Sequence, residues 1–211
     1  MEINQLIQTI AIYALPVLFA ITLHEAAHGY VARHFGDMTA FAQGRVSLNP
    51  VRHVDLIGTI VVPLVILLLS GGRFLFGWAK PVPVNYSALR RPKQQMAWVA
   101  AAGPGANLAM TLAWALALHV APTLPLFFGL PLGLMADAGI RVNLVLMFLN
   151  LIPILPLDGG RIVASLLPAR AAMSYARLEP WGLPLLILLL LTNVLDRALG
   201  PLVYASESLL R

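Results

Sequence analysis

The chain has 211 residues, of which 59% are hydrophobic and only 11% are charged, whereas soluble domains carry about 25% charged residues. This composition excludes an ordinary soluble domain and indicates an integral membrane protein that forms a single domain over residues 1–211. The net charge of +5 comes from scattered basic residues, with neither a basic run nor an aromatic platform, so we expect no nucleic-acid partner.

The first predicted element is a long apolar helix over about residues 4–33, which is long enough to span a bilayer. Near its end lie His24, Glu25 and His28. Histidines four residues apart lie on one face of a helix, so both rings reach one point, and the glutamate can take a proton from a metal-bound water. Ionisable groups at membrane depth are costly, so the pattern predicts a metal site. The absence of cysteine leaves histidine and carboxylate as ligands.

This first apolar stretch has no basic residue at its start and is longer than the apolar core of a signal peptide, so we expect it to be retained. A short polar segment follows, where the alternation from Thr39 to Leu48 favours a strand or hairpin at the membrane surface. His53 and Asp55 are candidates for a second pair of site residues, although we favour an ordinary pair in an interfacial loop.

Residues 56–70 are apolar, but as a helix they would cover only about 22 Å of the roughly 30 Å bilayer core. Pro63 interrupts them, so we predict a re-entrant or interfacial segment. The segment 80–85 is predicted to be extended, because its two prolines disfavour a helix. It could pair with an unfolded peptide as an added strand, or it could be a connector anchored at the interface by Trp78.

A second long helix is predicted over residues 94–119. It contains Gly103-Pro104-Gly105-Ala106-Asn107, where small residues allow close helix packing. Asn107 is a lone amide in an apolar helix, suited to hold a neighbouring helix, a site ligand or a substrate carbonyl. An uncharged loop with three prolines is expected over residues 121–133.

The third predicted span, over residues 137–157, is helical to about Asn150 and is then broken by Pro153 and Pro156. Asp158 follows this break, and an opened helix is a common setting for ion sites at membrane depth. The same aspartate is a good N-cap for the residues after it, and both roles are compatible.

Residues 161–180 are expected to form a surface helix or loop, before a last span over 181–195 and a polar tail. The predicted fold is therefore an all-α polytopic membrane protein with about four spanning helices, a re-entrant segment and short surface strands.

The basic loops are predicted to be cytoplasmic, in an inner membrane, by the positive-inside rule. The groups of polar and small residues at 24–28, 103–107 and 150–158 then all fall in the cytoplasmic half of the bilayer. These basic loops cover residues 33–55, 73–93 and 161–177.

A catalytic zinc ion needs three protein ligands and one open position. His24, His28 and Asp158 could supply the three, which leaves Glu25 free as a base. Glu179 is an alternative third ligand. A polytopic metal-binding or transport protein without proteolysis would also explain buried histidines, but it would not explain a glutamate at this position.

Three motifs, in this order, resemble those of the site-2 protease family of intramembrane zinc metalloproteases: His24-Glu25-Ala26-Ala27-His28, Gly103 to Asn107, and Asn150-Leu151-Ile152-Pro153 running to Leu157-Asp158-Gly159-Gly160. The resemblance implies cleavage of transmembrane segments of other membrane proteins, with one zinc per chain bound by His24, His28 and Asp158. It implies Glu25 as general base and Asn107 and Asn150 in support of substrate or ligands. The chain resembles the minimal bacterial subgroup, without PDZ or CBS domains.

Overall fold

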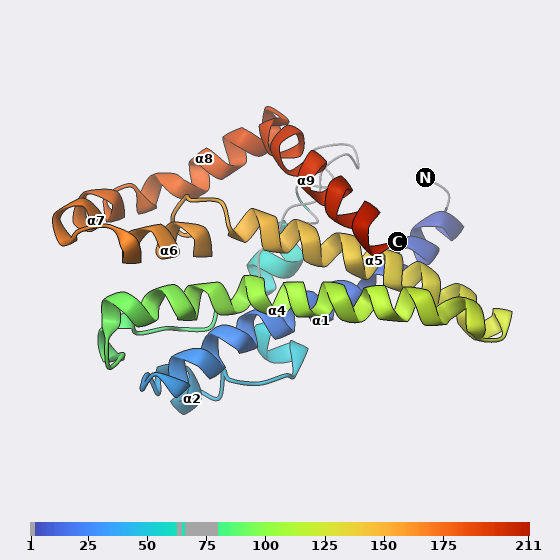
Figure 1. The fold of residues 1–211 in the computed structure, drawn as a ribbon, viewed down its shortest axis with the longest axis horizontal. Helices are drawn as coiled ribbons and strands as arrows, with labels where there is room; N and C mark the ends of the chain where they lie inside the picture. Colours follow the sequence, from blue (N-terminus) through green and yellow to red (C-terminus); the bar gives the residue numbers. More distant parts are fainter. Residues whose placement is uncertain (1–2, 63–64, 66–79) are drawn as a thin grey trace.

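The computed structural model describes residues 3–62, 65 and 80–211, and this part of the chain is built from helices without a strand (Figure 1). The prediction of an all-α protein is therefore confirmed, whereas the surface strands are not found among the residues described. The helices, in chain order, are α1 (Ile3–His34), α2 (Thr39–Ala42), η1 (Pro50–His53), η2 (Leu56–Val61), η3 (Tyr86–Ala88), α4 (Pro92–Val120), η4 (Ala121–Thr123), α5 (Leu126–Asn150), α6 (Asp158–Leu166), α7 (Ala169–Ala176), α8 (Glu179–Leu191) and α9 (Val194–Leu210).

Three of these helical stretches are long and apolar enough to cross a membrane: Ile7–His34, Pro92–Thr123 and Leu126–Asn150. A fourth crossing results if α7 and α8, which meet at 58°, are counted together. A spanning helix satisfies its own backbone hydrogen bonds, which is why it is stable where no water is present. The chain is accordingly a multi-pass membrane protein.

The long helices α1, α4 and α5 lie side by side, with α4 in contact with both others (Figure 1). Small residues allow this close approach, because a Cβ atom on Gly139 of α5 would lie 2.5 Å from the ring of Trp114 on α4. Large apolar side chains point outward instead, and Leu116 is 67% exposed. An apolar exterior of this kind suits contact with lipid rather than with water.

The predicted strand or hairpin over residues 39–48 is wrong, because α2 occupies the start of this segment. The first N–H of α2 donates to the Asp37 carboxylate at 2.9 Å, and the Arg45 N–H donates to the Ala40 carbonyl at 2.8 Å. These local hydrogen bonds close a helical turn. Alternation over so few residues does not distinguish such a turn from a strand.

The proline-rich loop predicted over residues 121–133 is also wrong in most of its length, because α5 already begins at Leu126. Pro122 lies in η4 and Pro125 precedes the first turn of α5. A proline fits there because the first N–H groups of a helix have no partner within the helix. Pro131 lies inside α5, so the apolar helix tolerates the loss of one backbone hydrogen bond.

The predicted polar tail is helical as well, since α9 follows α8 after a break at Asn193, which has a φ of 56°. The left-handed conformation of Asn193 ends α8 earlier than the predicted limit of residue 195. α9 packs along α5 (Figure 1). Arg141 Nε on α5 donates to Glu207 Oε1 on α9 at 2.9 Å, and this ion pair links the two helices.

Only part of the predicted re-entrant segment 56–70 is described. Residues 56–61 form the short π-helix η2, whose first turn is capped by Asp55 Oδ1 accepting from the Gly58 N–H at 2.7 Å. Residues 63–64 and 66–70 lie outside the described residues, as does Trp78, the predicted interfacial anchor. The re-entrant path therefore stays a prediction.

Candidate metal centre

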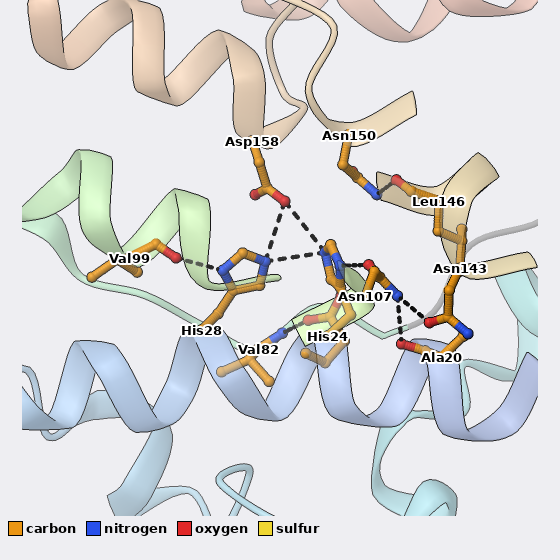
Figure 2. Close-up of polar contacts among 11 residues, drawn as sticks. Ala20, His24, His28, Val82, Val99, Asn107, Asn143, Leu146, Asn150 and Asp158 are labelled. Atoms are coloured by element: carbon orange, nitrogen blue, oxygen red, sulfur yellow. Dashed lines mark hydrogen bonds and ion pairs between the residues drawn. The ribbon is translucent and has the colours of Figure 1, made fainter. Parts of the chain in front are cut away.

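Two histidines from α1 and one aspartate from α6 meet between the long helices (Figure 2). The Nε2 atoms of His24 and His28 lie 3.1 Å apart. Asp158 Oδ2 lies 3.3 Å from the first and 3.4 Å from the second. Within the described part of the chain, these three residues are the only group of three or more side chains that could hold a metal ion.

Asp158 reaches the histidines because the chain turns back sharply between α5 and α6. Gly159 and Gly160 pack directly against the backbone of the preceding turn. A Cβ atom on Gly159 would lie 2.3 Å from the Leu151 carbonyl oxygen, and one on Gly160 would lie 2.5 Å from the Leu155 nitrogen. The two glycines therefore permit the tight turn that carries the carboxylate to α1.

The other ring nitrogens determine which way the two imidazoles face. His28 Nδ1 lies 2.7 Å from the Val99 carbonyl oxygen, and His24 Nδ1 lies 2.6 Å from Asn107 Oδ1. Both partners are acceptors, so each Nδ1 carries the hydrogen and each Nε2 presents a lone pair. Such contacts are the usual way in which a metal-binding histidine is fixed.

Three acceptor atoms thus face one another in a buried site, namely the two Nε2 atoms and Asp158 Oδ2. The Oδ2 atom is buried, and no hydrogen-bond donor from the described part of the chain reaches it. A cation bound by all three atoms would remove the repulsion between their lone pairs. Tetrahedral coordination with bonds of roughly 2.0 Å needs donor atoms about 3.3 Å apart, which matches the observed 3.1–3.4 Å. Two imidazoles and one carboxylate with an open fourth position suit catalytic zinc.

Gly103 of α4 leaves the space that the two rings occupy. A Cβ atom at this position would lie 2.5 Å from His24 Cε1 and 2.5 Å from His28 Nε2. The sequence indicated close helix packing for the motif around Gly103, and the structure adds the reason for a glycine at this residue.

Glu25 lies on α1 beside the two histidines and is half-buried. Its Oε2 accepts a hydrogen bond from the Val82 N–H at 2.8 Å. Val82 belongs to the segment 80–85, which forms neither a helix nor a strand. The lack of a helix agrees with its two prolines, and the extended backbone stays a prediction. The segment is held at both ends, because Lys80 N–H donates to the His53 carbonyl and Asn85 N–H donates to the Asp37 carboxylate. The segment therefore lies against α1 at the metal centre.

The remaining candidate residues lie in other surroundings. His53 is buried with Nε2 2.8 Å from the Ser47 carbonyl, and with Asp55 it forms no part of the three-residue group. Glu179 forms an ion pair with Arg161 at 3.2 Å and is likewise outside the group.

Asn150 lies at the end of α5 near Asp158, where its Nδ2 donates to the Leu146 carbonyl (Figure 2). A second asparagine of α5, Asn143, is fully buried and bonds to Asn107, and the sequence reasoning missed it. The sequence feature that could have revealed Asn143 is its position two helical turns before Asn150, as an amide in an apolar helix.

A bundle of spanning helices with a buried two-histidine, one-carboxylate centre defines a membrane-embedded metalloprotein. The model of peptidase family M50 matches residues 128–192. "Putative zinc metalloprotease YwhC" from Bacillus subtilis strain 168 is 35% identical over 195 residues, which cover 90% of this chain and 85% of that protein. The chain therefore belongs to peptidase family M50, the site-2 protease family, and the resemblance seen in its motifs is confirmed.

Two mycobacterial proteins are similar over most of the same region. "Putative zinc metalloprotease Rip2" of Mycolicibacterium smegmatis is 29% identical over 191 residues, 89% of this chain and 69% of that protein. The protein of the same name from Mycobacterium tuberculosis H37Rv is 29% identical over 183 residues, 85% of this chain and 66% of its own length. No solved structure matches the chain.

Proposed function

We propose that this intramembrane metalloprotease hydrolyses peptide bonds within or near transmembrane segments of other membrane proteins, with one zinc ion per chain bound by His24, His28 and Asp158. The observation that carries the proposal is the meeting of two imidazole Nε2 atoms with the buried Asp158 Oδ2, which has no hydrogen-bond donor among the described residues. When bound, zinc supplies a water of lowered pKa and polarises a peptide carbonyl. The relatives named as zinc metalloproteases support this choice of metal.

Glu25 is the proposed general base. It follows His24 directly on α1, so its carboxylate lies beside the metal centre without belonging to it. It would accept the proton of the attacking water and return that proton to the leaving amine. The Val82 N–H, at 2.8 Å from Oε2, would hold the carboxylate in one position during both transfers.

The substrate must present an extended backbone, because the carbonyls of an intact transmembrane helix are occupied by internal hydrogen bonds. The segment 80–85 forms no helix, its two prolines disfavour one, and it is adjacent to Glu25, which together favour pairing with the unwound substrate. Pro81 and Pro83 lack an N–H, that of Val82 bonds to Glu25, and the first two carbonyls of the segment accept from Arg45. The pairing would therefore depend on the Val84 N–H and on the carbonyls of residues 82–85.

The proposed orientation puts the metal centre in the cytoplasmic half of an inner membrane. Arg33 and His34 lie in the last turn of α1, and Lys93 lies in the first turn of α4, so basic residues gather at the helix ends nearest the centre. The part of the chain described carries the proposed ligands and base, in keeping with one metalloprotease domain over residues 1–211. Asn107 and Asn150 are proposed to support ligands or substrate.

The experiment that tests this function compares the wild type with Glu25→Gln in detergent or liposomes, using a transmembrane substrate and metal analysis. Glutamine keeps the shape of the side chain but cannot accept the proton, so zinc should be retained while cleavage falls by about 10²–10⁴-fold. Unchanged cleavage would refute the role of Glu25. The alternative, a metal transporter without proteolysis, predicts zinc flux into liposomes and no cleavage by either protein, and family membership disfavours it.

A further inference from the structure

Behind His24 a row of buried amides crosses from α4 to α5 (Figure 2). His24 Nδ1 bonds to Asn107 Oδ1 at 2.6 Å, and Asn107 Nδ2 donates to Asn143 Oδ1 at 2.9 Å. Asn143 Nδ2 in turn donates to the Gly139 carbonyl at 2.8 Å. Both asparagines are 0% exposed, so no bulk water competes for these hydrogen bonds.

This row of hydrogen bonds has a fixed direction. The Gly139 carbonyl can only accept, so Asn143 must direct its NH₂ group toward Gly139 and its oxygen toward Asn107. Asn107 must then present its own NH₂ to Asn143, which leaves its oxygen for His24. An oxygen at this position requires the hydrogen of His24 on Nδ1, so the Nε2 lone pair faces His28 and Asp158.

The opposite direction is incompatible with metal binding. If the Asn107 amide were turned round, its NH₂ would donate to His24 Nδ1, and a neutral His24 would carry its hydrogen on Nε2. That hydrogen would then occupy the position of the metal bond. The tautomer of His28 does not depend on the orientation of an amide side chain. Its Nδ1 is held by the Val99 backbone carbonyl, which cannot change from acceptor to donor.

We propose that Asn143 is a positioning residue: through Asn107 it holds His24 in the tautomer that binds the metal. The inference rests on the proposed zinc centre and adds to its support a second residue of α5, in addition to Asn150. The Ala20 carbonyl also accepts from Asn107 Nδ2, at the longer distance of 3.3 Å. Loss of Asn143 therefore weakens the preference of Asn107 for one orientation rather than abolishing it.

The test measures zinc affinity of the purified full chain by competition with a chelator, because affinity responds to the tautomer of His24 directly. Asn143→Leu keeps the number and branching of the side-chain heavy atoms and has no hydrogen-bonding group. Asn143→Asp in its protonated form can donate to Gly139 and accept from Asn107, and so keeps the direction. Thr111→Val is the matched control: Thr111 is equally buried and donates to the Asn107 backbone carbonyl, outside the row of amides.

Partners behind a metal ligand typically affect affinity by about 10–100-fold, so Asn143→Leu should weaken zinc binding by about 10-fold, the lower end of that range. Asn143→Asp and Thr111→Val should remain close to wild type. In an Asn107→Leu background, Asn143→Leu should have no further effect, because the amide through which it acts is gone. An equal loss in both backgrounds would show a merely structural role and overturn the proposal.

Wild-type zinc affinity in folded Asn143→Leu would overturn the role of Asn143 while leaving the proposed protease intact. Folding is checked by the unfolding temperature without zinc, and Asn143→Val replaces the leucine variant if that variant does not fold. A wild type that binds no zinc would overturn the proposed function itself. The two failures are thus distinguishable, and cleavage is not needed to read either result.

Discussion

Replacing Gly103 by alanine adds one methyl group at the point where α4 passes the rings of His24 and His28. The new Cβ would lie 2.5 Å from one atom of each ring. Carbon and nitrogen atoms in ordinary contact are about 3.5 Å apart, so the rings or α4 must move by about 1 Å. Metal ligands tolerate deviations of only about 0.2 Å. Gly103→Ala should therefore lose zinc and, with it, proteolysis.

The effect on folding should be much smaller than the effect on zinc. Alanine favours a helix over glycine by about 1 kcal/mol, whereas overpacking costs about 1–3 kcal/mol, so the metal-free stability should change by about 2 kcal/mol at most. The assay is zinc content of the purified protein together with its unfolding temperature in the presence of a chelator. A folded protein without zinc is the expected result.

Gly105→Ala provides the matched control, because it is the same change on the same helix two residues away. Outside the backbone of α4 itself, no atom of the described residues lies within 4 Å of the Cβ position at Gly105, so zinc should be retained and the helix slightly stabilised. Equal zinc content in Gly103→Ala and Gly105→Ala would refute the argument that Gly103 makes room for the two rings.

Further predictions concern the segment 80–85 and the C-terminal helix. Val82→Pro removes the N–H that holds Glu25, so cleavage should fall with zinc content unchanged, and wild-type cleavage would contradict the role of this N–H. Val84→Pro should also reduce cleavage if substrate pairs with this segment, and wild-type cleavage by this variant would contradict the pairing. The hydrogen bond from Arg141 lowers the pKa of Glu207 below its ordinary 4.5. This contribution to stability is present above the ordinary value and is lost as the pH falls below it. The unfolding temperature should therefore fall more steeply toward acid pH in wild type than in Glu207→Gln, and parallel curves would refute the contribution.

The parts of the fold and of the candidate site that follow from short-range geometry could be predicted from the sequence. Histidines at positions i and i+4 share a helix face wherever that helix lies, so the approach of His24 to His28 follows from spacing alone. To predict that Asp158 joins the two histidines, one further inference was needed. The basic loops were used to place all three motifs in the same half of the bilayer. The structure places Asp158 Oδ2 3.3 and 3.4 Å from the two Nε2 atoms, while the orientation in the membrane stays a prediction.

The errors arose where local sequence signals admit several structures. Alternation over residues 39–48 does not reveal that Asp37 caps a helical turn there. Prolines before and within α5 indicated a loop, because the sequence does not show that an apolar helix in lipid tolerates them. Asn143 could not be linked to the centre, since its role depends on the rotation of α5 against α4, which packing sets.

The proposed metal centre depends most on the identity of its third ligand. Zinc per chain, measured after purification for wild type, Asp158→Ala and Glu179→Ala, tests it directly. We predict about one zinc ion per chain in wild type and in Glu179→Ala, and little in Asp158→Ala, because only Asp158 has an oxygen facing both rings and a catalytic site needs three protein ligands. Full zinc content in Asp158→Ala together with its loss in Glu179→Ala would contradict the proposed centre.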